Sequence, residues 1–481
     1  MKISDVIYRE EYIFTDLSKD YEFNKICFNL KDLTEGDLLF ILNERLINFN
    51  SLNKLPIAVV CKPEVMLPQN IPSIRVENPR IALSMACFRY ENPVIQGTKI
   101  IGVTGTNGKT TTATLICKIL SDLGHKVGFI GTGKITIGDK VISDKNYSMT
   151  TPDPPLLYSS IRCMTEDGCD AIIMEVSSHS LALDKVAPLS FDYAVFTNLS
   201  WEHIDFHHSM EEYFNAKAKL FNKSKCAVIN IDDQYGQRLY NMLEGRRISV
   251  GSIQDADVSA KNVKNIGFDG TSYTYRQKNF SFKMRYHPAG VYNIYNSMLA
   301  ATVCIDMGCK PCEVKKVVNS ISSIPGRFEI INDKIMVIID YAHTAEAFEC
   351  ILRDLHAEKS AGKLIVVFGC GGNRDKAKRP LMAKTAEKYA DRIILTADNS
   401  RNESTKDIVA DIIRGFDEGN YEIKEKREDA IYSAILEAKD NDIVAIIGKG
   451  PEKYNIDKDG YHPFDEREII LSALKKRSMR G

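Results

Sequence analysis

The feature that most constrains this chain is a glycine-rich loop between an apolar run and a helical pattern. Residues 100–103 predict a buried strand, the loop Gly105-Thr-Asn-Gly-Lys-Thr-Thr follows, and apolar residues from 113 to 120 recur at helical spacing. Strand, glycine loop, Lys-Thr and helix is the order of a phosphate-binding loop. The alternative is a glycine-rich turn with a chance Lys-Thr, and the agreement of all three elements disfavours it.

The residue types of this loop suit the phosphates of ATP. Glycines let backbone N–H groups turn toward phosphate oxygens because no Cβ stands in the way. Lys109 can reach the β- and γ-phosphates, and the Thr110 hydroxyl can ligate Mg²⁺. The helix N-terminus adds partial positive charge. The predicted nucleotide-binding residues of the loop are Gly105, Thr106, Asn107, Gly108, Lys109, Thr110 and Thr111.

Composition excludes several classes of protein. The formal net charge of -1 is unlike that of a protein that coats nucleic acid or an anionic membrane. No apolar run approaches the ~20 residues of a membrane span, and the charged start of the chain is unlike a secretory signal. We therefore expect a cytoplasmic protein that binds small molecules and neither nucleic acid nor membrane. We also expect it to be a monomer.

The cysteines indicate reduced thiols. Twelve of them are scattered along 481 residues without a disulfide-framework pattern. Cys309-Lys-Pro-Cys312 has the spacing of a redox motif, but no second pair accompanies it. We expect this segment to be a turn that opens a helix.

Strand and helix patterns alternate along the chain, which predicts an α/β protein of three domains. Residues 1–96 would form a small N-terminal α/β domain, with strands near 36–42 and 55–61 and a helix from Pro79. Residues 97–325 would form the central P-loop domain around a parallel sheet, turning β-rich from about residue 255 and helical after Gly290. Residues 326–481 would form a Rossmann-like C-terminal domain.

Polar residues follow the buried strands predicted for the central domain. Glu175 ends an apolar run that starts at residue 171, and His203 comes shortly after the run at 193–196. Ligands of open parallel sheets bind at the carboxyl ends of the strands. We therefore expect Glu175 and His203 near the ligand.

Three loops of the last domain follow three apolar strands. Leu364-Ile-Val-Val-Phe leads to Gly369-Cys-Gly-Gly-Asn-Arg, Arg392-Ile-Ile-Leu-Thr leads to Ala397-Asp-Asn-Ser-Arg, and Asp442-Ile-Val-Ala-Ile-Ile leads to Gly448-Lys-Gly-Pro-Glu. One sheet would gather four side chains in a crevice, namely Arg374, Asn399, Arg401 and Glu452. Arginine holds carboxylates and glutamate holds an ammonium, so the set suits a small zwitterion. The alternative is a group of structural ion pairs.

Taken in order, the motifs of residues 79–465 resemble those of the Mur ligase family of peptidoglycan synthesis. Besides the loop, the matching segments are Thr150-Thr-Pro, Met174-Glu-Val-Ser-Ser-His, Phe196-Thr-Asn-Leu, Tyr213-Phe-Asn-Ala-Lys, Pro325-Gly-Arg-Phe-Glu, Asp340-Tyr-Ala-His-Thr, Phe368-Gly-Cys-Gly-Gly and Lys378-Arg-Pro-Leu-Met. No single segment is specific, but the ordered series is. The resemblance implies a UDP-sugar-binding type of domain at 1–96 and an amino-acid-binding one at 326–481.

The resemblance also assigns roles on the nucleotide side. The implied catalytic residues are Lys109, Glu175, His203 and Lys217. The further nucleotide contacts are Asn293, Asn296, Arg327, Asp340 and His343. The implied Mg²⁺ ligands are Thr110, Glu175, His203 and Lys217, the last as a carbamate, because Lys217 matches the family lysine that is carbamylated. From the residues alone, Lys217 and Lys219 would be solvated helix lysines.

The same resemblance assigns the other two substrates. Thr150, Thr151, Ser177 and Lys185 would contact the muramoyl-peptide acceptor, with Lys185 standing where the family usually has arginine. The residues implied for the incoming amino acid are Arg374, Asp398, Asn399, Arg401, Gly448 and Glu452. The implied activity is ATP-dependent amide ligation through an acyl phosphate, adding meso-diaminopimelate to UDP-N-acetylmuramoyl-L-alanyl-D-glutamate in cell-wall synthesis.

Departures from the family pattern leave alternatives open. Arg401 would hold the distal carboxylate of diaminopimelate, which lysine lacks, but Ser400 replaces the usual proline of this loop and Pro451 a usual histidine. Glu202 stands where aspartate is usual, and the first domain lacks the family's Asp-Ser-Arg signature near residues 28–31. The alternatives are a related ligase that uses L-lysine or another carboxylate acceptor, and an ATP-binding regulator without catalysis.

Overall fold

The computed structural model describes residues 1–43, 54–143, 149–287 and 290–479. They form two compact units. The first unit comprises residues 1–104, 125–194 and 216–225, and the second comprises 105–124, 195–215 and 226–481. Both units mix helices with largely parallel sheets, which confirms the predicted α/β class.

The first unit begins with a five-stranded sheet in the order β1-β5-β4-β3-β2. Its strands are β1 (Phe14–Thr15), β2 (Ile26–Cys27), β3 (Leu38–Phe40), β4 (Ala58–Cys61) and β5 (Ser73–Arg75). Only the β1–β5 pair is antiparallel. The two strands predicted from apolar runs are β3 and β4, and both are fully buried. Helix α1 (Pro79–Glu91) starts at the predicted proline, where the Asn78 side chain accepts hydrogen bonds from two backbone N–H groups.

The rest of the first unit is built on three parallel strands. Strand β10 (Ala171–Glu175) pairs with β6 (Lys99–Thr104) on one side and with β7 (Val127–Gly131) on the other. Strands β8 (Lys134–Ile137) and β9 (Lys140–Ser143) extend the sheet in antiparallel fashion. Helices α3 (Pro154–Glu166) and α4 (Ser178–Ala182) belong to this unit. Glu175 pairs in register with Val103, so it lies level with the residues that lead into the phosphate loop.

Four elements run across or close to the division between the units. They are β11 (Phe191–Phe196), α5 (Ile204–His207), α6 (Met210–Phe221) and β12 (Ser224–Asn230). In the second unit β12 pairs with β13 (Arg246–Gly251), which pairs with β14 (Val258–Asn265), both in parallel. Strands β15 (Thr271–Gln277) and β16 (Phe280–Tyr286) complete an antiparallel meander in the β-rich stretch that the sequence predicts.

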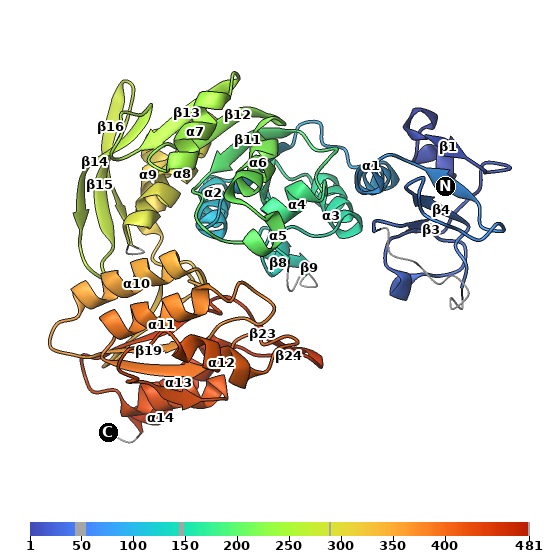
Figure 1. Cartoon of the computed structure of the whole chain (residues 1–481). Coiled ribbons are helices and arrows are strands. Elements are labelled where there is room, and N and C mark those ends of the chain that lie inside the picture. Colours follow the sequence, from blue (N-terminus) through green and yellow to red (C-terminus); the bar gives the residue numbers. More distant parts are fainter. Residues whose placement is uncertain (44–53, 144–148, 288–289, 480–481) are drawn as a thin grey trace. The chain divides into compact units, whose positions relative to one another are not determined.

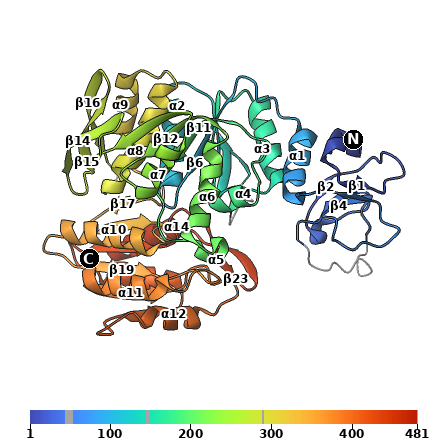
Figure 2. The ribbon, with the colours of Figure 1, turned by 45° about the horizontal axis from the view of Figure 1, so that its top comes forward.

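Helices of the second unit flank this meander and carry the phosphate loop. Helix α2 (Lys109–Asp122) packs on α8 (Val291–Asp306), and α9 (Pro311–Ser320) packs on β16, as Figure 2 shows. Helix α7 (Gln234–Met242) begins at Asp233, whose carboxylate caps it. Because α9 starts at Pro311, Cys309-Lys-Pro-Cys312 does open a helix. No disulfide joins any of the twelve cysteines, all of which lie in the part of the chain that the structure describes.

The second unit ends with a six-stranded sheet in the order β17-β18-β22-β19-β20-β21. Its strands are β17 (Glu329–Asn332), β18 (Met336–Asp340), β19 (Leu364–Phe368), β20 (Arg392–Thr396), β21 (Glu422–Lys424) and β22 (Ile443–Ile447). Every pair except β17–β18 is parallel. The three strands predicted to share a sheet are neighbours in it, so their following loops leave from the same edge.

Helices cover both faces of this sheet (Figure 1). On one face α10 (Ala345–Glu358), α11 (Lys378–Tyr389) and α12 (Thr405–Ile413) contribute buried apolar residues, and on the other face α13 (Arg427–Glu437) and α14 (Glu466–Ser478) do so. A hairpin of β23 (Tyr454–Asp457) and β24 (Gly460–Pro463) follows β22. In the part of the chain that the structure describes, no helix is long and apolar enough to cross a membrane.

Candidate active site

The phosphate loop needs glycine at two positions. Gly105 has φ +152°, and a Cβ there would lie 1.9 Å from the Thr197 hydroxyl oxygen. Gly108 has φ +83°, and a Cβ there would lie 2.4 Å from the Asn296 side-chain oxygen. Larger residues would clash in both places, so the glycines keep the loop backbone close to its neighbours.

Two cations lie at this loop. The Lys109 Nζ donates to the carbonyl oxygens of Gly105 and Thr106, both at 2.9 Å. A guanidinium nitrogen of Arg327 donates to the Thr110 hydroxyl oxygen at 3.0 Å. The structure thus brings Arg327 to the loop that is more than two hundred residues earlier in the sequence. The concentration of positive charge suits a polyphosphate.

The two predicted asparagines of α8 form one buried hydrogen-bonded group behind the loop. Asn296 donates to the side-chain oxygen of Asn293 at 3.1 Å, and its own oxygen accepts from the Thr112 hydroxyl at 3.2 Å. Both asparagines are 4% exposed. The bond between Asn296 and Thr112 connects α8 to the first turn of α2.

Asp340 and His343 lie at the end of β18. The Asp340 carboxylate accepts backbone N–H bonds from Phe328 and Ala342, both at 2.7 Å. His343 Nδ1 lies 2.9 Å from the Tyr341 carbonyl oxygen, so this nitrogen must carry the proton and Nε2 keeps a lone pair. Burial and the nearby Lys378 ammonium lower the pKa of His343 to about 3. The ring is therefore neutral at physiological pH.

His203 is connected to the phosphate loop by way of Tyr213. Its ring meets that of Tyr213 edge-on at 6.1 Å, and the Tyr213 hydroxyl is 3.1 Å from the Thr106 hydroxyl. The backbone of His203 is left-handed, with φ +59°, a conformation that few residues other than glycine adopt. The preceding residue, Glu202, forms a buried ion pair with Lys378 at 3.3 Å. Burial raises the pKa of Glu202.

Glu175 organises the predicted acceptor residues within the first unit. Its side-chain oxygens accept from the Thr132 N–H at 2.9 Å and from the Thr132 hydroxyl at 3.3 Å, and Thr132 in turn reaches the Thr150 hydroxyl at 3.3 Å. The Thr151 hydroxyl donates to the Glu175 carbonyl at 2.9 Å and accepts from the Ser177 N–H at 3.0 Å. Glu175, Thr150, Thr151 and Ser177 are therefore one connected group.

Two lysines predicted as site residues are buried. Lys185 is 9% exposed and pairs with Asp153 at 2.7 Å. Lys217, on α6, is only 1% exposed. The interpretation of Lys217 as a solvated helix lysine is therefore wrong, because α6 turns this side chain inward. Lys219 is exposed, as the same interpretation expects.

The last sheet brings together the six residues predicted for an amino acid, and we call them the three-loop cluster. They are Arg374, Asp398, Asn399, Arg401, Gly448 and Glu452. Asn399 donates to Glu452 at 2.7 Å, and Arg401 donates to the carbonyls of Gly372 and Asn399 at 3.0 and 3.2 Å. A Cβ at Gly371 would lie 3.0 Å from the Arg401 guanidinium and 3.6 Å from Arg374, so the two arginines flank this glycine.

The charges of the cluster are unevenly balanced. Among the described residues, neither Arg374 nor Arg401 has a carboxylate within ion-pair distance, so these two are not the structural ion pairs of the alternative interpretation. Burial and the Arg374 charge lower the pKa of Arg401, as expected for like charges that share a site. An anion at this place would relieve their repulsion.

A buried lysine lies beside the acidic residues of the cluster. Lys449 is fully buried and lies 3.8 Å from Asp398, 3.7 Å from Glu452 and 3.0 Å from the Asn399 side-chain oxygen. Although burial opposes ionisation, Lys449 and Arg427 hold the pKa of Asp398 below its usual value. Gly448 has φ +121°, and a Cβ there would lie 2.8 Å from Asp398.

Sequence reasoning missed the residues that hold these loops. Arg379 is fully buried and donates to Glu403 and Asp411 at 2.9 Å and to the Gly371 carbonyl at 3.2 Å. Glu403 also accepts from the Asn373 N–H. The Arg379–Glu403 pair thus links the loops that carry Arg374 and Arg401. Arg379 lies in the Lys378-Arg-Pro-Leu-Met motif, and Glu403 comes two residues after Arg401. Only the fold shows that the two side chains are hydrogen-bonded to each other.

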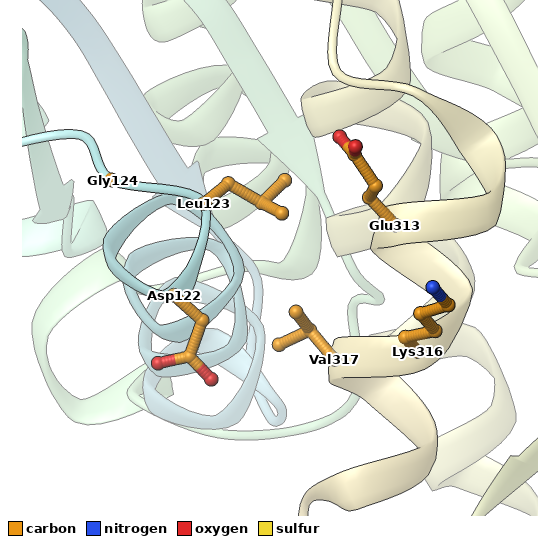
Figure 3. A pocket seen from close by; sticks show the side chains of 6 residues that line it. All are labelled: Asp122, Leu123, Gly124, Glu313, Lys316 and Val317. Atoms are coloured by element: carbon orange, nitrogen blue, oxygen red, sulfur yellow. The ribbon is translucent and has the colours of Figure 1, made fainter.

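A hollow lined by Asp122, Leu123, Gly124, Glu313, Lys316 and Val317 lies elsewhere on the second unit, between the end of α2 and α9 (Figure 3). The phosphate loop lies at the opposite end of α2, which is fourteen residues long. At 1.5 Å per residue the two ends are ~20 Å apart. The hollow is therefore separate from the site described above.

The residues predicted to bind metal do not include a dense ligand cluster. In the described ranges, no group of three or more His, Cys, Asp or Glu side chains could hold a metal ion. Thr110 and Glu175 supply oxygen, which suits Mg²⁺, whereas the His203 imidazole suits it less well.

Two sequence families match the chain. The Mur ligase middle domain matches residues 103–304, and the Mur ligase glutamate ligase domain matches residues 326–450. Among curated proteins, the chain is 37% identical, over 98% of both chains, to a UDP-N-acetylmuramoyl-L-alanyl-D-glutamate–2,6-diaminopimelate ligase 1 of Clostridium acetobutylicum. It is 39% identical, over 93% of both chains, to a diaminopimelate ligase of the same description from Aquifex aeolicus.

Solved structures agree with these relatives. A structure of UDP-N-acetylmuramoyl-L-alanyl-D-glutamate–2,6-diaminopimelate ligase has a TM-score of 0.65 and 27% identity, covering 96% of this chain and 98% of that chain. A Mycobacterium tuberculosis folylpolyglutamate synthase has a TM-score of 0.62 at 16% identity, covering 84% of this chain and 95% of that chain, which is a likeness of fold alone. Since relatives at 37% and 39% identity span nearly the whole chain, it belongs to the Mur ligase family.

Proposed function

We propose that this chain is an ATP-dependent ligase that joins 2,6-diaminopimelate to UDP-N-acetylmuramoyl-L-alanyl-D-glutamate in peptidoglycan synthesis. The observation that carries the proposal is the three-loop cluster. Among the described residues, Arg374 and Arg401 have no carboxylate within ion-pair distance, and the same cluster holds Glu452 with its donor Asn399. This pattern fits an amino acid with a second carboxylate, and the full-length relatives bear that name.

The proposed reaction has two balanced steps. A carboxylate oxygen of the acceptor attacks the γ-phosphorus of ATP, which breaks the bond to ADP and forms an acyl phosphate. The amine of the amino acid then attacks the acyl carbon, loses a proton, and expels inorganic phosphate. Lys109 and Arg327 lie at the loop where charge develops on the transferring phosphoryl group and would offset it. His343 would contact the nucleotide as a neutral ring.

Thr110, Glu175 and His203 would hold Mg²⁺, and Lys217 would join them if carbamylated. Bound Mg²⁺ supplies a Lewis acid that neutralises phosphate charge. Carbamylation turns a cation into a carboxylate, and the burial of Lys217 supports this proposal because the side chain is not the solvated helix lysine of the alternative interpretation. ¹³C-bicarbonate labelling followed by NMR would detect the carbamate, and Lys219 on the same helix is the matched control.

The remaining assignments are proposals with structural support. Thr150, Thr151, Ser177 and Lys185 would bind the acceptor, and their connection to Glu175 supports a common role. The division into domains at 1–96, 97–325 and 326–481 is supported by family matches that fall inside the last two. We also propose that the chain works as a monomer in the cytoplasm, which light scattering and fractionation would test.

Diaminopimelate is preferred over lysine because of Arg401. With L-lysine in the cluster, the Arg401 charge would have no distal carboxylate, and an unpaired partly buried charge is unfavourable. Ser400 leaves the loop without the rigidity of proline, but the loop is fixed by other bonds, including that from the Gly372 N–H to the Asn399 carbonyl at 2.9 Å.

ADP release with a panel of amino acids tests the proposal. The acceptor and ATP are held constant while diaminopimelate, L-lysine, L-ornithine and no amino acid are compared. We expect release to require both acceptor and amino acid, with diaminopimelate preferred by at least about a hundredfold in kcat/KM. Preference for lysine, activity with another acceptor alone, or no turnover with any acceptor would each contradict it and favour the corresponding alternative.

A further inference from the structure

Tyr341 touches both the nucleotide region and the three-loop cluster. It follows the last residue of β18, and its ring lies under Arg327, whose guanidinium carbon is 4.3 Å from the ring centroid. At its other end, the Tyr341 hydroxyl donates to a carboxylate oxygen of Glu452 at 3.1 Å. One side chain therefore contacts a cation of the nucleotide region and an anion of the amino-acid cluster.

The contacts on either side of Tyr341 continue into the two sites. Arg327 donates to the Thr110 hydroxyl of the phosphate loop at 3.0 Å. The second oxygen of Glu452 accepts from Asn399 at 2.7 Å. Hydrogen bonds and one cation–π contact thus form an unbroken series within the second unit, from Thr110 through Arg327, Tyr341 and Glu452 to Asn399.

The backbone around Tyr341 leaves little room for the series to relax. A Cβ at Gly450 would lie 2.7 Å from the Tyr341 Cβ, and a Cβ at Gly326 would lie 2.2 Å from the Pro451 nitrogen. The turn that precedes Arg327 and the loop that carries Glu452 are thus packed backbone on backbone. A bond from the Gly448 N–H to the Asp340 carbonyl at 2.9 Å ties the same strands together. A shift of Arg327 would be transmitted because a close-packed contact cannot absorb it.

The hydroxyl of Tyr341 holds the oxygen of Glu452 that faces away from a buried cation. Tyr341 donates to Oε1 at 3.1 Å, whereas Asn399 donates to Oε2 at 2.7 Å and the Lys449 ammonium lies 3.7 Å from the same Oε2. Without the hydroxyl, the carboxylate would lose a bond that restrains its rotation toward Lys449. A closer pair with Lys449 would then replace the pair with the ammonium of a substrate.

We propose that Tyr341 is a positioning residue that couples nucleotide binding to amino-acid binding, by aiming Glu452 at the substrate ammonium while packing against Arg327. The inference rests on the proposed function, because it takes the three-loop cluster as the amino-acid site. It makes two separable claims. The hydroxyl serves the amino acid, and the ring serves the connection to the nucleotide region.

Three variants of the full chain separate these claims. Tyr341→Phe removes the hydroxyl and keeps the ring under Arg327, whereas Tyr341→Leu removes both. Tyr432→Phe is the matched control, since its hydroxyl lies 2.8 Å from Ser472 on an exposed part of the same unit. Calorimetric titration of diaminopimelate, with and without ADP, reports the affinity and the coupling factor, and the KM values for amino acid and ATP report the same split during turnover.

We expect Tyr341→Phe to weaken amino-acid binding about tenfold, the size of a lost hydrogen bond to a charged group, and to leave the ADP affinity within about twofold. Tyr341→Leu should in addition abolish the effect of ADP on amino-acid affinity. Tyr432→Phe should match the unaltered protein. Unchanged amino-acid affinity in Tyr341→Phe, or parallel losses for ADP and amino acid together with a lower melting temperature, would overturn the proposal.

The outcome for Tyr341 can be told apart from the outcome for the proposed function. The titrations use the amino acid that supports ADP release in the unaltered protein, whichever it is. If that amino acid is not diaminopimelate, the proposed substrate fails, and the comparison of Tyr341 variants is made with the true one. A coupling factor in the unaltered protein that persists in Tyr341→Leu would refute the coupling role alone.

Discussion

The phosphate loop and the three-loop cluster bind different kinds of ligand and are built in different ways. The loop is a contiguous segment whose shape depends on backbone conformation, with Gly105 and Gly108 packed against Thr197 and Asn296. The cluster is assembled from loops that follow β19, β20 and β22, and its shape depends on side chains. Arg379 holds the first two loops, and Arg427 bonds to the carbonyls of Ala397 and Ile447 at 3.3 and 3.0 Å.

The difference shows where each site is vulnerable. In the loop, backbone N–H groups and a helix N-terminus can bind phosphate whatever the side chains are. The catalytic contribution of the loop therefore depends mainly on one side chain, that of Lys109. The cluster instead relies on buried charges that must be paired, such as Arg427 with Glu466 at 2.6 Å. We therefore expect changes in the loop to affect catalysis, and changes around the cluster to affect selectivity and stability.

The largest effect is expected for Lys109→Met. Removing the ammonium at the phosphate loop should lower kcat by about a thousandfold, because charge on the transferring phosphoryl group loses its partner. ADP release measures the loss. Lys118→Met, on an exposed turn of the same helix, should retain full activity. A kcat for Lys109→Met within tenfold of that of the unaltered enzyme would contradict this expectation, since the loop lysine would then contribute little to catalysis.

Arg401→Lys should have the next largest effect, which is a loss of selectivity for diaminopimelate over L-lysine. A lysine cannot hold a carboxylate with two parallel bonds, so kcat/KM for diaminopimelate should fall about a hundredfold, or about 2.7 kcal/mol. The kcat/KM for L-lysine should change much less, so the ratio of kcat/KM for diaminopimelate to kcat/KM for L-lysine should fall. Arg414→Lys is the control, because Arg414 is exposed and outside the cluster. Equal losses for both amino acids would show that Arg401 has no role in selectivity.

Glu403→Gln should destabilise the protein by about 1–2 kcal/mol at pH 7, because Glu403 is an anion that Arg379 and Lys376 hold. The Arg379 hydrogen bonds lower the pKa of Glu403 to about 2, below the usual 4.5. A depressed carboxyl pKa contributes stability above about pH 4.5 that is lost as the pH falls toward 2.

The pH dependence tests this assignment of Glu403. Urea unfolding at pH 7, 5, 4 and 3.5 should show the difference between Glu403→Gln and the unaltered protein shrinking below pH 4.5. Glu428→Gln, at an exposed position on α13, should show no such difference at any pH. A difference that stays constant from pH 7 to 3.5 would mean that the negative charge of Glu403 does not stabilise the cluster loops.

The smallest effect is expected for Cys312→Ser. Cys312 is an exposed free thiol at the start of α9, away from both sites. Activity should stay within experimental error, with or without reducing agent. A change in activity that depends on the reducing agent would revive a redox role for the Cys309–Cys312 segment.

Much of the fold could be predicted because its signals are local. Apolar runs predicted β3, β4, β10 and the three neighbouring strands of the last sheet, and prolines marked the starts of α1 and α9. The grouping of Arg401, Asn399 and Glu452 followed from the rule that parallel strands share a carboxyl edge.

Other features depend on long-range partners and could not be predicted from one sequence. The burial of Lys217 depends on which side of α6 meets the rest of the protein, and nothing in its neighbouring residues specifies this. In the sequence Glu202 stands out only as an unusual replacement for aspartate, whereas the structure pairs it with Lys378 far along the chain. The positions of Tyr341 and Arg379 follow from the packing of loops that the sequence does not reveal.

The most direct test of the account follows the oxygen atoms of the acceptor carboxylate. The reacting carboxylate is labelled with ¹⁸O, and the inorganic phosphate released during ligation is analysed by mass spectrometry. Activation through an acyl phosphate predicts that each released phosphate carries one oxygen from that carboxylate. Phosphate without the label, released in step with product, would contradict the account, because the carboxylate would then never have been bonded to phosphorus.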